Sequence, residues 1–194
     1  MKSHFLLLLS LLISSATFAQ NTTIIKCDSI YRGKSITIKL INFDDERDGY
    51  DVEKNSILIV SQKLNGKNSV LIKDSIFSRA QKVEFRDFNN DTIKDILVQN
   101  ISDVRSNWTY NLYLYDTKTN NFKRVTGFEE IKNPIYNSEY KIIESHVNSG
   151  KNWMAFYKIR NYKIHDYHIE IIDDGSFKSG KEYKKALKKI SQKQ

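Results

Sequence analysis

Residues 56–74 read SILIVSQKLNGKNSVLIKD, with two apolar-rich runs, 56–62 and 69–74, on either side of an Asn65-Gly66 pair. Both runs are rich in Ile and Val, which favour extended backbone. An Asn-Gly pair between two such runs favours a type I′ turn, whose twist matches that of two antiparallel strands. The segment therefore predicts a β-hairpin.

The same period of two extends along the chain in both directions. In residues 109–116, TYNLYLYD, alternation puts Tyr110, Leu112 and Leu114 on one face and Asn111, Tyr113 and Tyr115 on the other. Further extended runs are expected at 36–40, 83–86, 95–100, 122–125, 140–148, 153–160 and 162–173. Frequent turn signals and no long helical period before the tail predict an all-β fold, an antiparallel meander of propeller-like or sandwich-like form.

The first nineteen residues, MKSHFLLLLSLLISSATFA, read as a signal peptide. Lys2 precedes a short apolar run, and Thr17 and Ala19 place small residues where a signal peptidase cuts. A membrane anchor is the alternative, but the run is shorter than the roughly 20 apolar residues that cross a bilayer. We expect no membrane span and a periplasmic or secreted protein, with residues 20–177 forming a single β-rich domain.

Residues 178–194 form a basic amphipathic tail. Ser179 and Glu182 have capping-box spacing, which predicts the start of a short helix. Its apolar stripe is expected to contain Tyr183, Ala186, Leu187 and Ile190. We favour a helix that docks on the body or frays in solvent over one that contacts anionic lipid or an acidic partner, because the stripe is short.

Most of the positive charge lies in that tail. The formal net charge of the 194-residue chain is +8, of which residues 178–194 carry +6 and residues 20–177 only +1. A nucleic-acid-binding protein spreads its basic surface over a folded face, so no nucleic acid is expected as partner. Cys27 is the only cysteine, so the fold needs no internal disulfide, and its thiol is read as structural.

One loop carries ligand chemistry. In residues 83–100, VEFRDFNNDTIKDILVQN, oxygen-bearing side chains stand at loop positions 1, 3, 5 and 9, namely Asp87, Asn89, Asp91 and Asp95. The backbone carbonyl of Ile93, at position 7, supplies a fifth oxygen. Several hard oxygen donors around one turn suit Ca²⁺, and a divalent ion relieves the repulsion between close carboxylates. An Asp/Asn-rich turn without metal is the alternative.

This loop departs from a regular EF-hand. Val98 stands at position 12, where a bidentate Glu is usual, and strands rather than helices are expected on both sides. Position 6 is Thr92, where glycine normally provides a positive φ, so the turn is distorted or the site is weak. A second acidic segment, residues 44–51, lacks a position-9 ligand because Val52 stands there, and we read it as a solvated loop.

The motif FRDFNNDTIKDILV resembles the calcium loop of FG-GAP/VCBS repeats, usually Asp-x-Asn-x-Asp-Gly-x-x-Asp before an apolar strand. The aromatic and turn pattern of residues 80–172 also resembles a family of small exported bacterial proteins of β-propeller-like form, which includes periplasmic inhibitors of lysozyme-like secretion-system effectors. The resemblance implies metal ligation at Asp87, Asn89, Asp91 and Asp95. It also implies a partner-facing loop from Ser145 to Lys151.

No catalytic signature is visible, so we expect a non-catalytic protein. Arg105 and Trp108 form an arginine-plus-tryptophan pair typical of binding anchors, and Ser149 and Lys151 are the other expected partner contacts. Lysozyme-like enzymes cleave with carboxylates, which a cationic loop complements. The prediction is a calcium-stabilised inhibitor or immunity protein against a lysozyme-like cell-wall hydrolase. The alternatives are an envelope module that binds a glycan or surface protein through Tyr113 and Tyr115, and a hydrolase.

Overall fold

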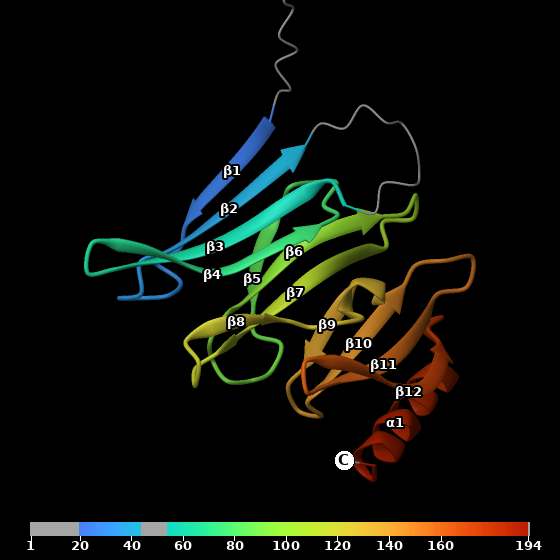
Figure 1. Cartoon of the computed structure of the whole chain (residues 1–194). Coiled ribbons are helices and arrows are strands. Elements are labelled where there is room, and N and C mark those ends of the chain that lie inside the picture. Colours follow the sequence, from blue (N-terminus) through green and yellow to red (C-terminus); the bar gives the residue numbers. More distant parts are fainter. Residues whose placement is uncertain (1–19, 44–53, 194) are drawn as a thin grey trace, which may run out of the picture.

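The computed structural model describes residues 20–43 and 54–193. The predicted signal peptide, residues 1–19, and the acidic segment 44–51 therefore lie outside the described residues. Within the described part, twelve strands form three four-stranded antiparallel sheets, and one α-helix follows at the C-terminus (Figure 1). The predicted all-β meander with a C-terminal helix is confirmed.

Each sheet is a meander of consecutive strands. The first sheet contains β1 (Gln20–Lys26), β2 (Ile36–Phe43), β3 (Ser56–Leu64) and β4 (Lys67–Ile76). The second contains β5 (Val83–Arg86), β6 (Asp95–Ser102), β7 (Trp108–Asp116) and β8 (Asn121–Arg124). The third contains β9 (Pro134–Asn137), β10 (Ile142–Val147), β11 (Trp153–Arg160) and β12 (Lys163–Ile172). A short 3₁₀ helix, η1 (Phe128–Glu130), joins the second sheet to the third.

The hairpin turns follow the sequence signals. Asn65 and Gly66 both have positive φ, 50° and 77°, and Leu64 pairs with Lys67, as a two-residue type I′ turn requires. Asn161 and Tyr162, with φ of 50° and 60°, make a similar turn between β11 and β12. Local turn chemistry therefore sets the register of these two hairpins.

The second sheet lies between the other two, so both of its faces are buried. Tyr113 and Tyr115 of β7 face the first sheet, while Leu112 and Leu114 pack toward the third. This is the alternation predicted from residues 109–116. Because neither face meets solvent, β7 is buried almost throughout.

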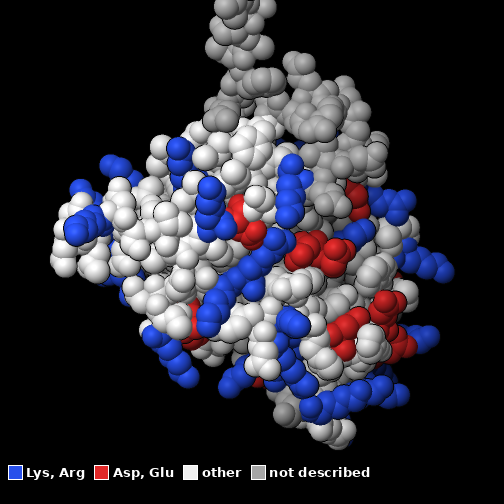
Figure 2. Space-filling view, viewed as in Figure 1, with Lys and Arg blue, Asp and Glu red and all other residues white. Residues whose placement is uncertain are grey.

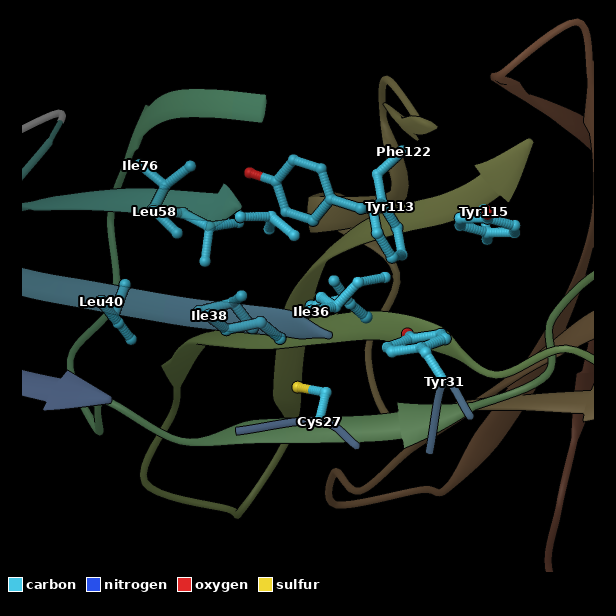
Figure 3. Close-up of a cluster of buried hydrophobic side chains, with 13 residues drawn as sticks. Cys27, Tyr31, Ile36, Ile38, Leu40, Leu58, Ile76, Tyr113, Tyr115 and Phe122 are labelled. Carbon is cyan, nitrogen blue, oxygen red and sulfur yellow. The ribbon is translucent and has the colours of Figure 1, made fainter. Parts of the chain in front are cut away.

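The core between the first and second sheets is shown in Figure 3. Ile38, Leu40 and Leu58 of the first sheet pack against Tyr113 and Phe122 of the second. Cys27 lies in this core just after β1 and is completely buried. Burial raises the pKa of its thiol to about 11, which keeps the thiol protonated and unreactive at neutral pH.

The C-terminal helix α1 (Phe177–Ser191) covers the outer face of the third sheet (Figure 1). Ala186, Leu187 and Ile190 are buried there against Phe156 and Tyr167, so the predicted docked helix is confirmed. The predicted cap is wrong. The N-cap is Ser176, whose hydroxyl accepts a hydrogen bond from the Ser179 backbone N–H at 3.1 Å. The helix begins earlier than predicted because Ser176 follows the tight Asp174-Gly175 turn.

Charge is mixed over the face shown in Figure 2, where Lys and Arg side chains are scattered with Asp and Glu between them. Among the described residues, no helix is long and apolar enough to cross a membrane.

Candidate functional site

The predicted metal loop connects β5 to β6, so strands flank it on both sides as expected. Its backbone turns sharply, because Asn90 and Thr92 both adopt positive φ, 61° and 70°. Asparagine tolerates this region, whereas a β-branched residue is strained there. Thr92 thus takes the conformation that glycine normally provides at this position.

The exposed part of the loop is closed by hydrogen bonds to its own backbone. Asp87 Oδ1 accepts from the Asn90 N–H at 2.6 Å, and its Oδ2 accepts from the Thr92 N–H at 2.9 Å. Asp91 Oδ1 accepts from the Ile93 N–H at 2.8 Å, and Oδ2 accepts from the Asn89 side-chain amide at 2.9 Å. These contacts hold the loop in its turn.

Asp95 is fully buried beneath the loop. Its two oxygens accept backbone N–H groups of Phe88 at 2.8 Å and of Tyr115 at 3.1 Å, which tie the loop to β7. Burial raises the pKa of Asp95 to about 7, and the charges of Asp91 and Asp87 add to that rise against the two hydrogen bonds. A buried carboxyl below two further carboxylates is therefore an electrostatically costly arrangement.

The donor chemistry of the loop fits calcium, since carboxylate, amide and carbonyl oxygens are the ligands that this ion prefers. The positions of these side chains are less favourable for binding a metal ion. Among residues 20–43 and 54–193, no group of three or more His, Cys, Asp or Glu side chains is placed to hold a metal ion. Calcium at Asp87, Asn89, Asp91, Ile93 and Asp95 therefore stays a prediction.

The two loops that carry the predicted partner contacts lie side by side. Loop 103–107 joins β6 to β7, and loop 148–152 joins β10 to β11. The side chain of Asn148 donates to the Arg105 carbonyl at 3.4 Å. Residues more than 40 positions apart in sequence are thus brought to one edge of the molecule, and we call 103–108 and 148–152 together the loop surface.

Asn107 joins the two halves of the loop surface, although sequence reasoning did not single it out. Its Oδ1 accepts from the Asn148 N–H at 2.7 Å and from Asn133 Nδ2 at 3.2 Å. Its Nδ2 donates to Asp103 Oδ2 at 2.8 Å and to the Asn148 carbonyl at 2.9 Å. All four hydrogen-bonding positions of this buried amide are used, so the loop surface rests on a rigid polar support.

Asp103 and Asn133 complete this support. Asp103 Oδ1 accepts from the Arg105 N–H at 2.9 Å, and the Asn107 side chain holds the pKa of Asp103 well below its usual range. Asn133 Oδ1 accepts from the Trp108 N–H at 2.8 Å. An Asp-x-Arg-x-Asn spacing signals a local turn, but no sequence signal connects it to Asn133 or Asn148.

The predicted contacts differ in exposure. Arg105 and Lys151 are exposed, Ser149 is half-buried, and Trp108 is 37% exposed. Val104, next to Arg105 in the chain, is fully exposed at 102%. The loop surface therefore combines two cationic side chains with an aromatic and an aliphatic one.

Two sequence expectations about binding residues are wrong. Ser145 is buried in β10, where its hydroxyl donates to the Lys132 carbonyl at 2.7 Å, so the exposed loop begins only at Asn148. Tyr113 and Tyr115 are buried between the first and second sheets and cannot form a glycan-binding face. Their alternation was read correctly, but the layer that covers them was not foreseen.

The fold places the chain among all-β proteins of stacked four-stranded antiparallel sheets. No protein-family model matches the chain, and no curated protein matches it. Among solved structures, a Xanthomonas type IV secretion system related protein is similar, with a TM-score of 0.44 and 12% sequence identity. The likeness covers 82% of this chain and 95% of that chain. At this TM-score and identity it carries no argument about the function of this chain.

Proposed function

We propose that this chain is an exported, non-catalytic binding protein that contacts a protein partner through the loop surface. The observation that carries the proposal is the fully satisfied Asn107 amide, which fixes two distant loops in one arrangement. A rigid support under exposed side chains reduces the conformational entropy that is lost when a partner binds. Such a rigid support beneath exposed loops is typical of a docking surface.

The residues on the loop surface favour a partner with an acidic cleft. Lys132 is paired with Asp103 at 3.3 Å, but among the described residues no carboxylate pairs with Arg105 or Lys151. Arginine and tryptophan are enriched among residues that dominate binding energy. A lysozyme-like hydrolase, whose cleft carries a pair of catalytic carboxylates, is the partner class that we propose, which makes the chain an inhibitor or immunity protein.

The test is inhibition of a panel of purified muramidases by the purified protein. We expect one of them to be inhibited, and we expect Arg105→Ala and Trp108→Ala each to weaken inhibition by about tenfold or more, a loss of about 1.4 kcal/mol. Arg32→Ala is the charge-matched control, because Arg32 is exposed on the β1–β2 connection of the first sheet. Inhibition that is absent, or equal in all variants, would overturn the proposal.

We propose calcium as a structural ion of loop 87–95, which it would stabilise in the folded state only. Thermal melting with calcium and with chelator tests this. Asp87 and Asp91 also accept hydrogen bonds, so their loss lowers the melting midpoint without metal. The decisive quantity is therefore the calcium-dependent rise in the midpoint, which Asp87→Ala and Asp91→Ala should abolish and Asp28→Ala should keep. No rise in the wild-type protein contradicts a calcium site.

Export is tested separately. The mass of the protein recovered from the periplasm or the medium should correspond to a chain that starts at Gln20. Recovery of uncleaved protein in the membrane fraction would contradict export by a cleaved signal.

A further inference from the structure

A cavity of about 340 Å³ lies where the third sheet meets the first turns of α1. Its volume is at the lower end of the range typical of small-ligand sites. Glu144, Met154 and Ile171 line it from the sheet, and all three are buried. Gly180 and Tyr183 line it from α1. The cavity thus combines an apolar wall with a buried acid.

Glu144 is held rigidly in that wall. Its Oε1 accepts from Asn137 Nδ2 at 2.7 Å and from the Tyr183 hydroxyl at 2.8 Å. Its Oε2 lies 3.6 Å from His146 Nε2 and has no closer donor among the described residues. Burial would raise the pKa of Glu144, but His146, Asn137 and Tyr183 together lower it below its ordinary value. The group is therefore a carboxylate at neutral pH, with Oε1 held by two donors and Oε2 facing only His146 among the described residues.

On the α1 side of the cavity, the lining includes Gly180, which has no side chain. Gly180 lies inside the helix, where glycine is a poor helix former. A Cβ at this position would meet no atom within 4 Å. Gly180 therefore borders open space in the cavity wall, so a larger side chain at this position has room to enter it.

The neighbouring charges also favour a cation. A second cavity of about 520 Å³ shares Ile172 and Asp173 with the first and extends to Asp174 and Lys151 of the loop surface. Asp174 Oδ1 accepts from the Ser176 N–H at 2.9 Å, and the Ser176 hydroxyl accepts from the Ser179 N–H. The linings of the two cavities contain three carboxylates, Glu144, Asp173 and Asp174, against one lysine, Lys151.

We propose that the cavity binds a primary ammonium group on an aliphatic stem, namely a lysine side chain of the protein partner. The ammonium group would donate to Glu144 Oε2, and its methylene stem would pack on Met154 and Ile171. This proposal rests on the proposed function for the source of the lysine, since the second cavity leads directly to the loop surface. It does not depend on which partner the loop surface contacts.

The experiment is an NMR titration of the purified protein with N-acetyl-lysine methylamide. N-acetyl-norleucine methylamide is the matched probe, because it keeps the stem and lacks the ammonium group. We expect saturable shifts at residues lining the cavity with the lysine probe, with a dissociation constant in the millimolar range, and none with the norleucine probe. Glucosamine, which carries its ammonium group on a sugar ring, should not compete.

Two variants separate binding from folding. Glu144→Gln keeps the Oε1 acceptor for Asn137 and Tyr183 but removes the charge, and should weaken lysine binding at least tenfold. Gly180→Leu should fill the cavity and abolish binding, while Lys184→Leu on an exposed position of α1 should not. No saturable shift, equal binding of norleucine, or unchanged binding by Glu144→Gln would overturn the proposal. Because the probes are small molecules, this result is independent of whether any muramidase is inhibited.

Discussion

At the scale of single residues, Asp and Asn side chains shape most of the loops. Asp87, Asp103 and Asp116 each accept backbone N–H groups from residues two to five positions later. Such local turns were predictable, because short polar side chains bond to their own backbone wherever they occur. The contacts of Asn107 with Asn133 and Asn148 were not, since they depend on which strands become neighbours.

The first residue-scale prediction concerns Asn107→Asp. The substitution replaces two N–H donors by a carboxylate oxygen that faces Asp103 and the Asn148 carbonyl. Lost hydrogen bonds and a buried repulsion should lower the free energy of unfolding by about 3 kcal/mol. Urea unfolding measures the loss, and Asn68→Asp at the exposed start of β4 is the control. An equal effect of the two substitutions would mean that the Asn107 network does not support the loops.

A second residue-scale prediction concerns Thr92→Gly. Thr92 has a φ of 70°, where a β-branched side chain is strained and glycine is not. Relief of this strain should stabilise the protein by about 1 kcal/mol and raise the melting midpoint by a few degrees. Thr119→Gly provides the comparison, because Thr119 has no positive φ and should lose stability. A lower midpoint for Thr92→Gly would contradict the strained turn.

At the scale of elements, period-two runs and turn residues predicted most strands, whereas β1, β9 and η1 were missed. The sequence of β1, QNTTIIK, shows no alternation of apolar and polar residues. β9 is only Pro134–Asn137, and three residues make η1, so neither is long enough to show a period. The apolar stripe of α1 was predicted because three buried positions repeat at helical spacing. Its cap was placed at Ser179 because Glu182 suggested a capping box, but the Gly175 turn starts the helix at Ser176.

The docking of α1 makes an element-scale prediction. Leu187 is only 5% exposed and packs in the cluster that joins α1 to the third sheet. Leu187→Ala should therefore lower the free energy of unfolding by about 3 kcal/mol, whereas Lys188→Ala on the exposed face should change it little. Urea unfolding followed by circular dichroism distinguishes them. If Leu187→Ala were as harmless as Lys188→Ala, the helix would not be docked in solution.

The loop element 103–107 makes a prediction about pH. Hydrogen bonds from Asn107 hold the pKa of Asp103 below its ordinary value of about 3.9. A depressed folded-state pKa means that this stabilisation is present above that ordinary value and is lost as the pH falls through the folded-state pKa. The urea midpoint of the wild-type protein should therefore be higher than that of Asp103→Asn at pH 6. The difference between the two midpoints should shrink as the pH falls. A difference that grows on acidification would show that the pKa of Asp103 is not lowered in the folded state.

At the scale of the whole molecule, the sheets stack as layers, with the second sheet in the middle and α1 on the outside of the third (Figure 1). The sequence pattern of β7 already alternates two apolar faces, but a pattern cannot say which strands cover each face. That depends on long connections and on contacts between residues far apart in the chain. The same limit explains why the cavity at Glu144 and the loop surface were not foreseen as assembled sites.

Polar contacts as well as apolar ones join the layers. Arg124 of β8 binds Asp74 of β4 at 3.1 Å and Glu129 of η1 at 3.3 Å. The hydroxyl of Tyr113 donates to the same Asp74 oxygen at 2.8 Å. Glu129 Oε2 is buried and has no hydrogen-bond partner among the described residues. Arg124 is thus the cation that allows two carboxylates to lie at the boundary between the first and second sheets.

Arg124→Leu should therefore weaken the whole stack. The variant leaves Asp74 and Glu129 without their shared cation, and both carboxylates are only 25% exposed. We expect a loss of about 2 kcal/mol, less than for a fully buried pair because water still reaches the site. Lys132→Leu is the control, since the pair that Lys132 forms with Asp103 at 3.3 Å is more exposed, at 43% and 39%, and should matter much less. Both variants are measured by urea unfolding with tryptophan fluorescence and circular dichroism as separate probes. Coincident transitions at a lower midpoint for Arg124→Leu would indicate that the layers unfold together. A midpoint equal to that of Lys132→Leu would show that apolar packing alone joins the sheets.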